Sequence, residues 1–174
     1  MLSRLAYRTR QFWNALPHPQ KKVETRALLP YLTPPQLVLF RRMKPSEQAH
    51  AWQMLQHLLA SGHTTPDLLT AALLHDVGKI LSPLSLLDRV VIVLGQRFFR
   101  RAAKRWSGQP SNRLQRPFVV AAQHPGWGAD LAKQAGASTR SVDLIRRHQD
   151  PLPANPGSRT ERLLAALQAA DNEN

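Results

Sequence analysis

The chain has 174 residues, a length that suits one domain with a buried core, and it contains no cysteine. Disulfides, thiolate zinc sites and cysteine nucleophiles are therefore excluded, and any metal would need histidine and carboxylate ligands. The 24 Lys and Arg residues against 11 Asp and Glu give a formal charge of +13, which favours an anionic ligand without selecting one. A merely well-solvated basic surface explains the charge equally well.

Apolar residues recur at helical spacing along nearly the whole chain, and proline clusters mark the joints between segments. No stretch shows the period-2 alternation of a strand, so the pattern predicts an all-α fold. The predicted helices cover residues 2–16, 22–31, 34–42, 46–61, 66–77, 84–106, 113–124, 127–135, 139–148 and 159–171.

Two observations bear on location in the cell. No segment approaches the run of about 18 apolar residues that spans a membrane. Arginines interrupt the N-terminal segment, which therefore lacks the apolar centre of a signal peptide. We expect a cytoplasmic protein.

The predicted helix over 46–61 carries His50 and His57 on one flank of its apolar stripe, two turns apart. A lone histidine at such a position is more often a partly buried side chain than a metal ligand. His57 keeps that interpretation, and His50 depends on what the rest of the chain provides.

The predicted helix over 66–77 is apolar nearly all round, so we expect it at the centre of the domain. It runs into His75 and Asp76, with Lys79 one turn further on. An ionised aspartate is costly in such a place unless a cation compensates for it. An arginine ion pair or a metal could do so, and a metal would use both side chains and leave Lys79 to meet an anion.

Three further candidates lie at the ends of later helices. His124 stands immediately before Pro125, His148 continues the apolar stripe of 139–148, and Asp171 completes the stripe of 159–171. Each alone is more often structural than functional. Helical bundles, however, build metal sites from side chains that different helices project inward.

The segment 88–108 interleaves aromatic residues with arginine and lysine. It could form a rim that guides a nucleotide to the site, or an interfacial helix on anionic lipid. A packed helix with a solvated basic face is the third interpretation. The chain shows no helix-turn-helix or other specific nucleic-acid motif.

Five stretches resemble the HD-domain superfamily of metal-dependent phosphohydrolases, in the family's order and over roughly residues 45–171. They are "EQAHAWQML", "AALLHDVGKI", "AAQHPGWGADLAKQAG", "VDLIRRHQDP" and "LLAALQAAD". The third and fourth are most similar to the HD-GYP-like subgroup with an enlarged, two-metal site. The chain lacks that subgroup's "GYP" loop, which argues against cyclic di-GMP as the substrate. The resemblance implies a basic helical extension over 1–44 and an HD-type helical bundle over 45–174.

The resemblance also implies a ligand set for one or two divalent ions, Mn, Fe, Mg or Zn. One ion would be held by His50, His75, Asp76 and Asp171. Asp76 would be shared with a second ion, which His124 and His148 would hold. Histidine ligands need an acceptor for their other ring nitrogen, and the carboxylates of Glu47, Asp67 and Asp150 are candidates for that role.

The resulting expectation is a phosphohydrolase or phosphodiesterase that cleaves a nucleotide-like phosphate ester with a metal-activated hydroxide. Asp76 and Lys79 would be the catalytic residues, and Lys79 and Arg147 would bind the phosphorylated substrate. The alternative is a degenerate, non-catalytic HD domain that binds a nucleotide or a partner. Two features favour it: Arg147 stands where the two-metal relatives carry the first of two histidines, and Asp171 lies close to the C-terminus.

Overall fold

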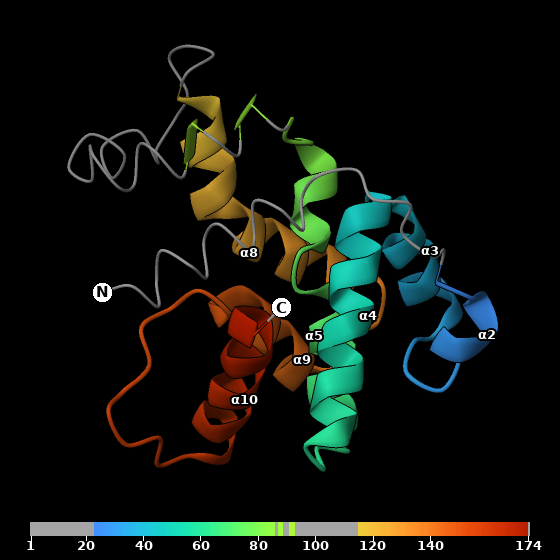
Figure 1. The fold of residues 1–174 in the computed structure, drawn as a ribbon, viewed down its shortest axis with the longest axis vertical. Helices are drawn as coiled ribbons and strands as arrows, with labels where there is room; N and C mark the ends of the chain where they lie inside the picture. The colour runs from blue at the N-terminus through green and yellow to red at the C-terminus, as the bar shows by residue number, and fades with distance from the viewer. Residues whose placement is uncertain (1–22, 86, 89–90, 93–114, 174) are drawn as a thin grey trace.

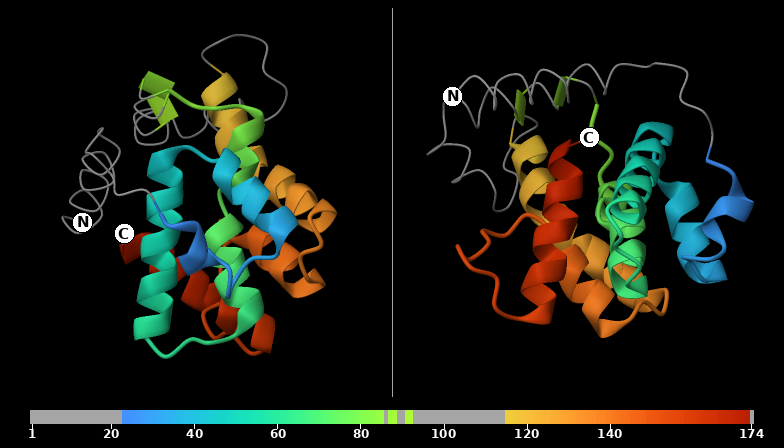
Figure 2. Two further views of the ribbon diagram at one scale, coloured as in Figure 1. Left: turned by 90° about the vertical axis from the view of Figure 1, so that its right-hand side faces the viewer. Right: turned by 60° about the horizontal axis from the view of Figure 1, so that its bottom comes forward.

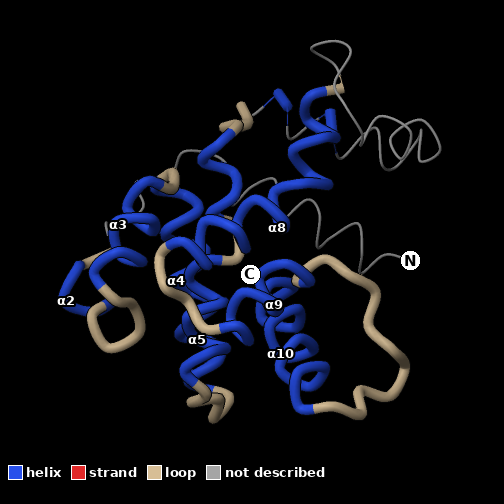
Figure 3. Tube along the Cα trace, turned by 180° about the vertical axis from the view of Figure 1, so that it is seen from behind, coloured by secondary structure: helices blue, strands red, loops and turns tan. Residues whose placement is uncertain are grey.

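The computed structural model describes residues 23–85, 87–88, 91–92 and 115–173. Every regular element in these ranges is a helix and none is a strand, which confirms the predicted all-α fold (Figure 3). The predicted helix over 2–16 lies outside the described residues, as does most of the one over 84–106 and most of the basic segment 88–108. No helix in the described part of the chain is both long and apolar enough to cross a membrane.

Figure 1 shows the order of the helices, with a long loop between the last two. In chain order they are α2 (Thr25–Leu28), α3 (Pro34–Arg42), α4 (Pro45–Ala60), α5 (Pro66–Leu74), the 3-10 helix η1 (Val77–Leu81), α8 (Arg116–Gln134), α9 (Thr139–Arg147) and α10 (Arg159–Glu173).

Helices α3, α4 and α5 each begin with proline, whose fixed φ suits the first helical position. Side chains close two of these ends. Gln36 Oε1 accepts from the Thr33 backbone N–H at 3.1 Å, and Glu47 Oε2 accepts from that of Lys44 at 3.1 Å. Prolines and caps in the sequence therefore place these starts within one residue of the predicted ones.

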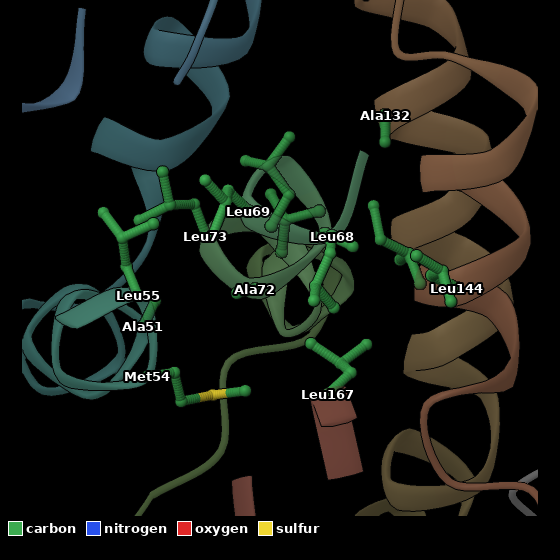
Figure 4. Close-up of a cluster of buried hydrophobic side chains, with 14 of the residues drawn as sticks. Ala51, Met54, Leu55, Leu68, Leu69, Ala72, Leu73, Ala132, Leu144 and Leu167 are labelled. Carbon is green, nitrogen blue, oxygen red and sulfur yellow. The ribbon is translucent and has the colours of Figure 1, made fainter. Parts of the chain in front are cut away.

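Helix α5 lies at the centre of the bundle, as its apolar sequence predicts. Figure 4 shows Leu68, Leu69, Ala72 and Leu73 between side chains of α4 on one side and those of α8 and α9 on the other, with α10 below. All four residues are buried. The turned views in Figure 2 show the other helices arranged around this core.

The described part of the predicted N-terminal extension packs on the same core. Leu28 on α2, Leu32 in the following loop and Phe40 on α3 are buried and belong to the same apolar cluster as α5. Helix α2 covers only four residues of the helix predicted over 22–31. A domain boundary after residue 44 stays a prediction.

The predicted break at Pro125 is wrong, because α8 continues through this proline. Proline has no N–H to donate to the carbonyl of Ala121, four residues earlier. The His124 Nδ1–H donates to that carbonyl at 3.1 Å and to the carbonyl of Val120 at 3.0 Å. The side chain before the proline thus replaces the missing backbone donor and lets the helix continue.

The helix predicted over 66–77 ends earlier, at Leu74. Asp76 adopts φ −94° and ψ 1°, and the chain tightens into η1. This turn places Gly78 directly against α8, where a Cβ on Gly78 would lie 2.0 Å from the His124 carbonyl oxygen and 2.7 Å from Gly128 N. The early end of α5 therefore brings the backbone after Asp76 into contact with the helix that carries His124.

Candidate metal centre

All six predicted metal ligands come together in the fold, in two groups. His50, His75 and Asp171 form what we call the first group, and Asp76, His124 and His148 form the second group. Within each group the candidate ligand atoms all lie within 4.8 Å of one another. Residues up to 121 positions apart in the sequence thus share one small volume, as His50 Nε2 and Asp171 Oδ1 do at 2.9 Å.

Each ligand comes from a different position in the helices. His50 lies in the first half of α4, His75 and Asp76 lie between α5 and η1, His124 lies in the middle of α8, His148 follows α9, and Asp171 lies near the end of α10.

Imidazole rings connect the two groups. The ring centroids are 5.4 Å apart for His50 and His75, 5.2 Å for His75 and His148, and 5.2 Å for His148 and His124. The four rings form a continuous row, so the groups are two halves of one site.

Three of the histidines are oriented by their own helices. In His75, His124 and His148, Nδ1 donates to a main-chain carbonyl three or four residues earlier, at 2.8 to 3.0 Å. The acceptors are the carbonyls of Ala72, Val120 and Ile145. This bond occupies Nδ1 and leaves Nε2 of each ring as the candidate ligand atom.

The three carboxylates expected to orient these rings contact other groups. Glu47 caps α4. Asp67 accepts from the hydroxyl of Ser138 at 2.5 Å and the guanidinium of Arg140 at 2.9 Å. Asp150 lies 3.8 Å from Arg147 Nε. For the three oriented histidines, main-chain carbonyls accept the hydrogen bonds from Nδ1 that the sequence suggested for side-chain carboxylates.

Asp76 contacts both groups. Its Oδ1 lies 3.3 Å from His124 Nε2, and its Oδ2 lies 3.5 Å from His75 Nε2 and 2.5 Å from Lys79 Nζ. Burial alone would raise the pKa of Asp76, but the Lys79 ammonium and the His75 ring more than offset it and hold the pKa well below its ordinary value. The buried carboxylate is therefore ionised and surrounded by cationic or neutral nitrogen.

Charge pairing already links the residues of the first group to one another and to Asp76 of the second group. Burial lowers the pKa of His75, but the Asp76 carboxylate outweighs it and raises that pKa to about 9. Burial raises the pKa of Asp171, but its hydrogen bond with His50 and the nearby His75 lower it to about 2. Hydrogen bonds and charge attraction between these side chains thus stabilise the group without a metal.

The pKa of His148 shifts in the opposite direction from that of His75, and this residue provides the sharpest test of a metal site. Burial and the neighbouring His75 lower the pKa of His148 to about 3, so its ring is neutral. Among the buried side-chain atoms in the described ranges, His148 Nε2 is the one without a hydrogen-bond partner. A buried nitrogen lone pair with no donor facing it is costly, and a divalent cation would satisfy it.

The two predicted substrate-binding residues differ in their contacts. Lys79 on η1 bonds to Asp76 at the site. Arg147 forms ion pairs with Asp143 at 3.2 Å and with Asp150. Their roles toward a substrate stay predictions. His57 pairs with Glu173 at 3.0 Å, outside both groups, in agreement with its structural interpretation.

Sequence reasoning overlooked Gln149. Its Nε2 lies 3.5 Å from His124 Nε2, at the second group. The signal available in the sequence was its position directly after His148, in the turn that ends α9.

A comparison with protein families finds a match to the family model described as HD domain, over residues 48–173. The match covers most of the chain and contains every predicted ligand from His50 to Asp171. Comparisons with curated proteins and with solved structures give no match.

Proposed function

Since the chain belongs to the HD domain family, whose members are generally metal-dependent hydrolases, we propose that it is a phosphohydrolase or phosphodiesterase for a nucleotide-like phosphate ester. The observation that carries the proposal is the unpartnered Nε2 of the buried, neutral His148, within 4.8 Å of ligand atoms of His124 and Asp76. Folded proteins seldom leave a buried polar side-chain atom without a partner, so this atom supports a ligand at the second group.

The residues present fit divalent ions bound through nitrogen and oxygen. His50, His75 and Asp171 would hold one ion, and Asp76, His124 and His148 the other; Mn, Fe, Mg or Zn suit such a donor set. Divalent ions bound in such a site supply Lewis acidity and a water that ionises near neutral pH. The buried walls of the second group exclude bulk water, which strengthens every charge interaction inside.

Lys79 would act on the phosphate itself. Its ammonium lies at the edge of Asp76 and its side chain is 22% exposed, so it can reach both the buried carboxylate and an anion that arrives from solvent. A cation at that place would stabilise negative charge on the phosphoryl oxygens. The formal charge of +13 would favour the approach of such a substrate.

The second candidate function is a non-catalytic nucleotide- or partner-binding module. The observation that favours it is Arg147, whose guanidinium pairs with Asp143 and Asp150 instead of supplying a ligand to the second group. A module of this kind would retain the fold and the affinity for phosphate but lack turnover.

A panel of phosphomonoesters and phosphodiesters with added Mn²⁺, Mg²⁺ or Zn²⁺ tests the proposal. We expect hydrolysis of at least one ester, lost by more than about a hundredfold in Asp76→Ala and in the isosteric Asp76→Asn. His57→Ala, which changes a histidine outside both groups, serves as the control. Less than about one metal ion per chain after reconstitution would refute the enzyme. Full metal content without turnover would favour the binding module.

We also propose that residues 45–174 form the domain that carries this activity, and that the partner is a phosphorylated small molecule. Contact of segment 88–108 with an anionic membrane surface is a separate proposal, which its basic and aromatic sequence supports. Flotation with anionic liposomes at low salt tests it, and absence of association would dismiss it.

A further inference from the structure

We propose that Gln149 is a further substrate-binding residue, which donates its side-chain N–H to a phosphate oxygen beside the second group. The inference rests on the proposed function, because it needs a metal at the second group and a phosphate that reaches it. Neither Lys79 nor Arg147 provides this contact to the phosphate oxygen.

The backbone that carries Gln149 is held on both sides. The Asp150 N–H donates to the Arg147 carbonyl at 2.8 Å and closes the turn after α9. The Gln168 side-chain amide on α10 donates to the Asp150 carbonyl, also at 2.8 Å. The turn is therefore tied to a neighbouring helix, and the position from which the Gln149 side chain starts is fixed before any ligand binds.

The side chain extends from this turn to a buried ligand atom. Gln149 itself is exposed, whereas His124 and His148 are buried. The Gln149 amide nitrogen lies 3.5 Å from His124 Nε2. His124 Nδ1 faces main-chain carbonyls, and its Nε2 faces both this amide and Asp76 Oδ1, the latter at 3.3 Å. The NH₂ end of the amide is the end that faces the second group.

A cation on His124 would bind at the Nε2 atom that the Gln149 NH₂ group faces. The Gln149 NH₂ group would then lose its acceptor while it remains at the solvent-facing edge of the second group. A phosphate oxygen that arrives from solvent would supply a new and stronger acceptor, since hydrogen bonds to anions are stronger than those to neutral groups.

The other candidate donors are already paired with carboxylates. Lys79 bonds to Asp76, and Arg147 pairs with Asp143 and Asp150, so each would have to weaken an ion pair to bind phosphate. A neutral amide has no such competing carboxylate within its turn, where Asp150 pairs with Arg147. Gln149 can therefore exchange a weak, long contact for a phosphate at little cost.

Isothermal titration calorimetry with inorganic phosphate, on protein loaded with Mn²⁺, measures this contact. We expect Gln149→Ala to weaken phosphate binding by about three- to tenfold, the effect of one hydrogen bond, with unchanged manganese content. Gln149→Glu should weaken it further, because a carboxylate would repel the anion. Gln56→Ala, which truncates an exposed glutamine on α4, should leave the affinity unchanged.

Each other outcome has a defined meaning. Equal phosphate affinity in the wild type and Gln149→Ala would overturn the role of Gln149 and leave the proposed function intact. Tighter manganese binding in Gln149→Glu, without loss of phosphate affinity, would overturn it by making Gln149 a metal-site residue. A wild type that binds manganese but no phosphate would overturn both this inference and the proposed function.

Discussion

The two groups of candidate ligands differ in how far the protein alone satisfies them. In the first group, His50 and Asp171 hydrogen-bond to each other, and their side chains are 24% and 30% exposed. In the second group all three residues are buried, and His148 Nε2 has no partner. Both groups carry ligand-type residues, but only the second is left with an unsatisfied atom in the protein alone.

This difference indicates that the groups contribute to the protein in different ways. Ion pairs and hydrogen bonds stabilise the first group without a metal. Its residues therefore stabilise the fold in addition to holding any ion. In the second group Asp76 is ion-paired, but His148 Nε2 is a buried acceptor without a donor, which is a cost to folding. We therefore expect the metal-free fold to depend on the first group and the metal-bound state to depend on both.

The largest expected effect concerns metal content. The wild type should bind two divalent ions per chain, and His50→Gln and His148→Gln should each lose one. An ion present at a thousand times its dissociation constant stabilises the fold by about 4 kcal/mol. Each variant should therefore lose about half of the rise in Tm that metal produces.

Metal analysis after dialysis and thermal unfolding with and without chelator measure both quantities. His57→Gln, on the same helix as His50 but outside both groups, should behave as the wild type. Two ions per chain in His148→Gln would contradict the assignment of the second group.

A smaller effect should separate the groups in the absence of metal. His50→Leu removes the hydrogen bond to Asp171, and we expect it to lower the free energy of unfolding by about 1 to 2 kcal/mol. His148→Leu removes the unsatisfied nitrogen together with one bond to the Ile145 carbonyl, so the change should stay within about 1 kcal/mol.

Urea unfolding in the presence of a chelator gives both values. His57→Leu, which breaks only the surface pair with Glu173, should cost at most about 1 kcal/mol. If the His148 and His50 variants were equally destabilised, the contrast between the two groups would be lost.

The smallest effect concerns the start of α10, the helix that carries Asp171. Glu161 accepts from the backbone N–H groups of Gly157 and Ser158 at 2.9 Å, and these bonds lower its pKa below 4.5. A carboxylate whose pKa is lower in the folded state stabilises the fold above the unfolded pKa, and this contribution disappears as the pH falls through the folded one.

The loss of stability on acidification from about pH 5 to about pH 3 should therefore be smaller in Glu161→Gln than in the wild type. Glutamine keeps an acceptor oxygen but does not titrate in this range. Urea unfolding at the two pH values measures the difference. An equal loss of unfolding free energy in Glu161→Gln and the wild type would show that the cap does not contribute.

Much of the site could be predicted because metal ligands are residue types with a recognisable order. His75 and Asp76 stand out at the end of an apolar helix, and Asp171 stands out at the end of an apolar stripe. Their convergence follows from inward-facing positions on separate helices. The all-α fold followed from the same periodicity, and the bounds of α3 agree with the predicted 34–42.

What could not be predicted depends on main-chain groups, which leave no mark in the sequence. The acceptors of the histidine Nδ1 protons are carbonyls, and any residue type can supply a carbonyl. The continuation of α8 through Pro125 depends on the His124 side chain meeting the freed Ala121 carbonyl, a contact that exists only in the folded helix. Gln149 was overlooked because a glutamine in a turn resembles any solvated polar residue.

The contact between Gly78 and α8 has a consequence for which ions the protein accepts. Gly128 N, on α8, would lie only 2.7 Å from a Cβ on Gly78, so no side chain separates the two backbones. Asp76 and His124 therefore sit on segments whose spacing cannot be adjusted by rotating a side chain between them. A site with such fixed walls selects by ionic radius. We expect it to prefer ions that form bonds of about 2.0 to 2.2 Å, and to discriminate against Ca²⁺, whose bonds of about 2.3 to 2.6 Å would require the two backbones to move apart.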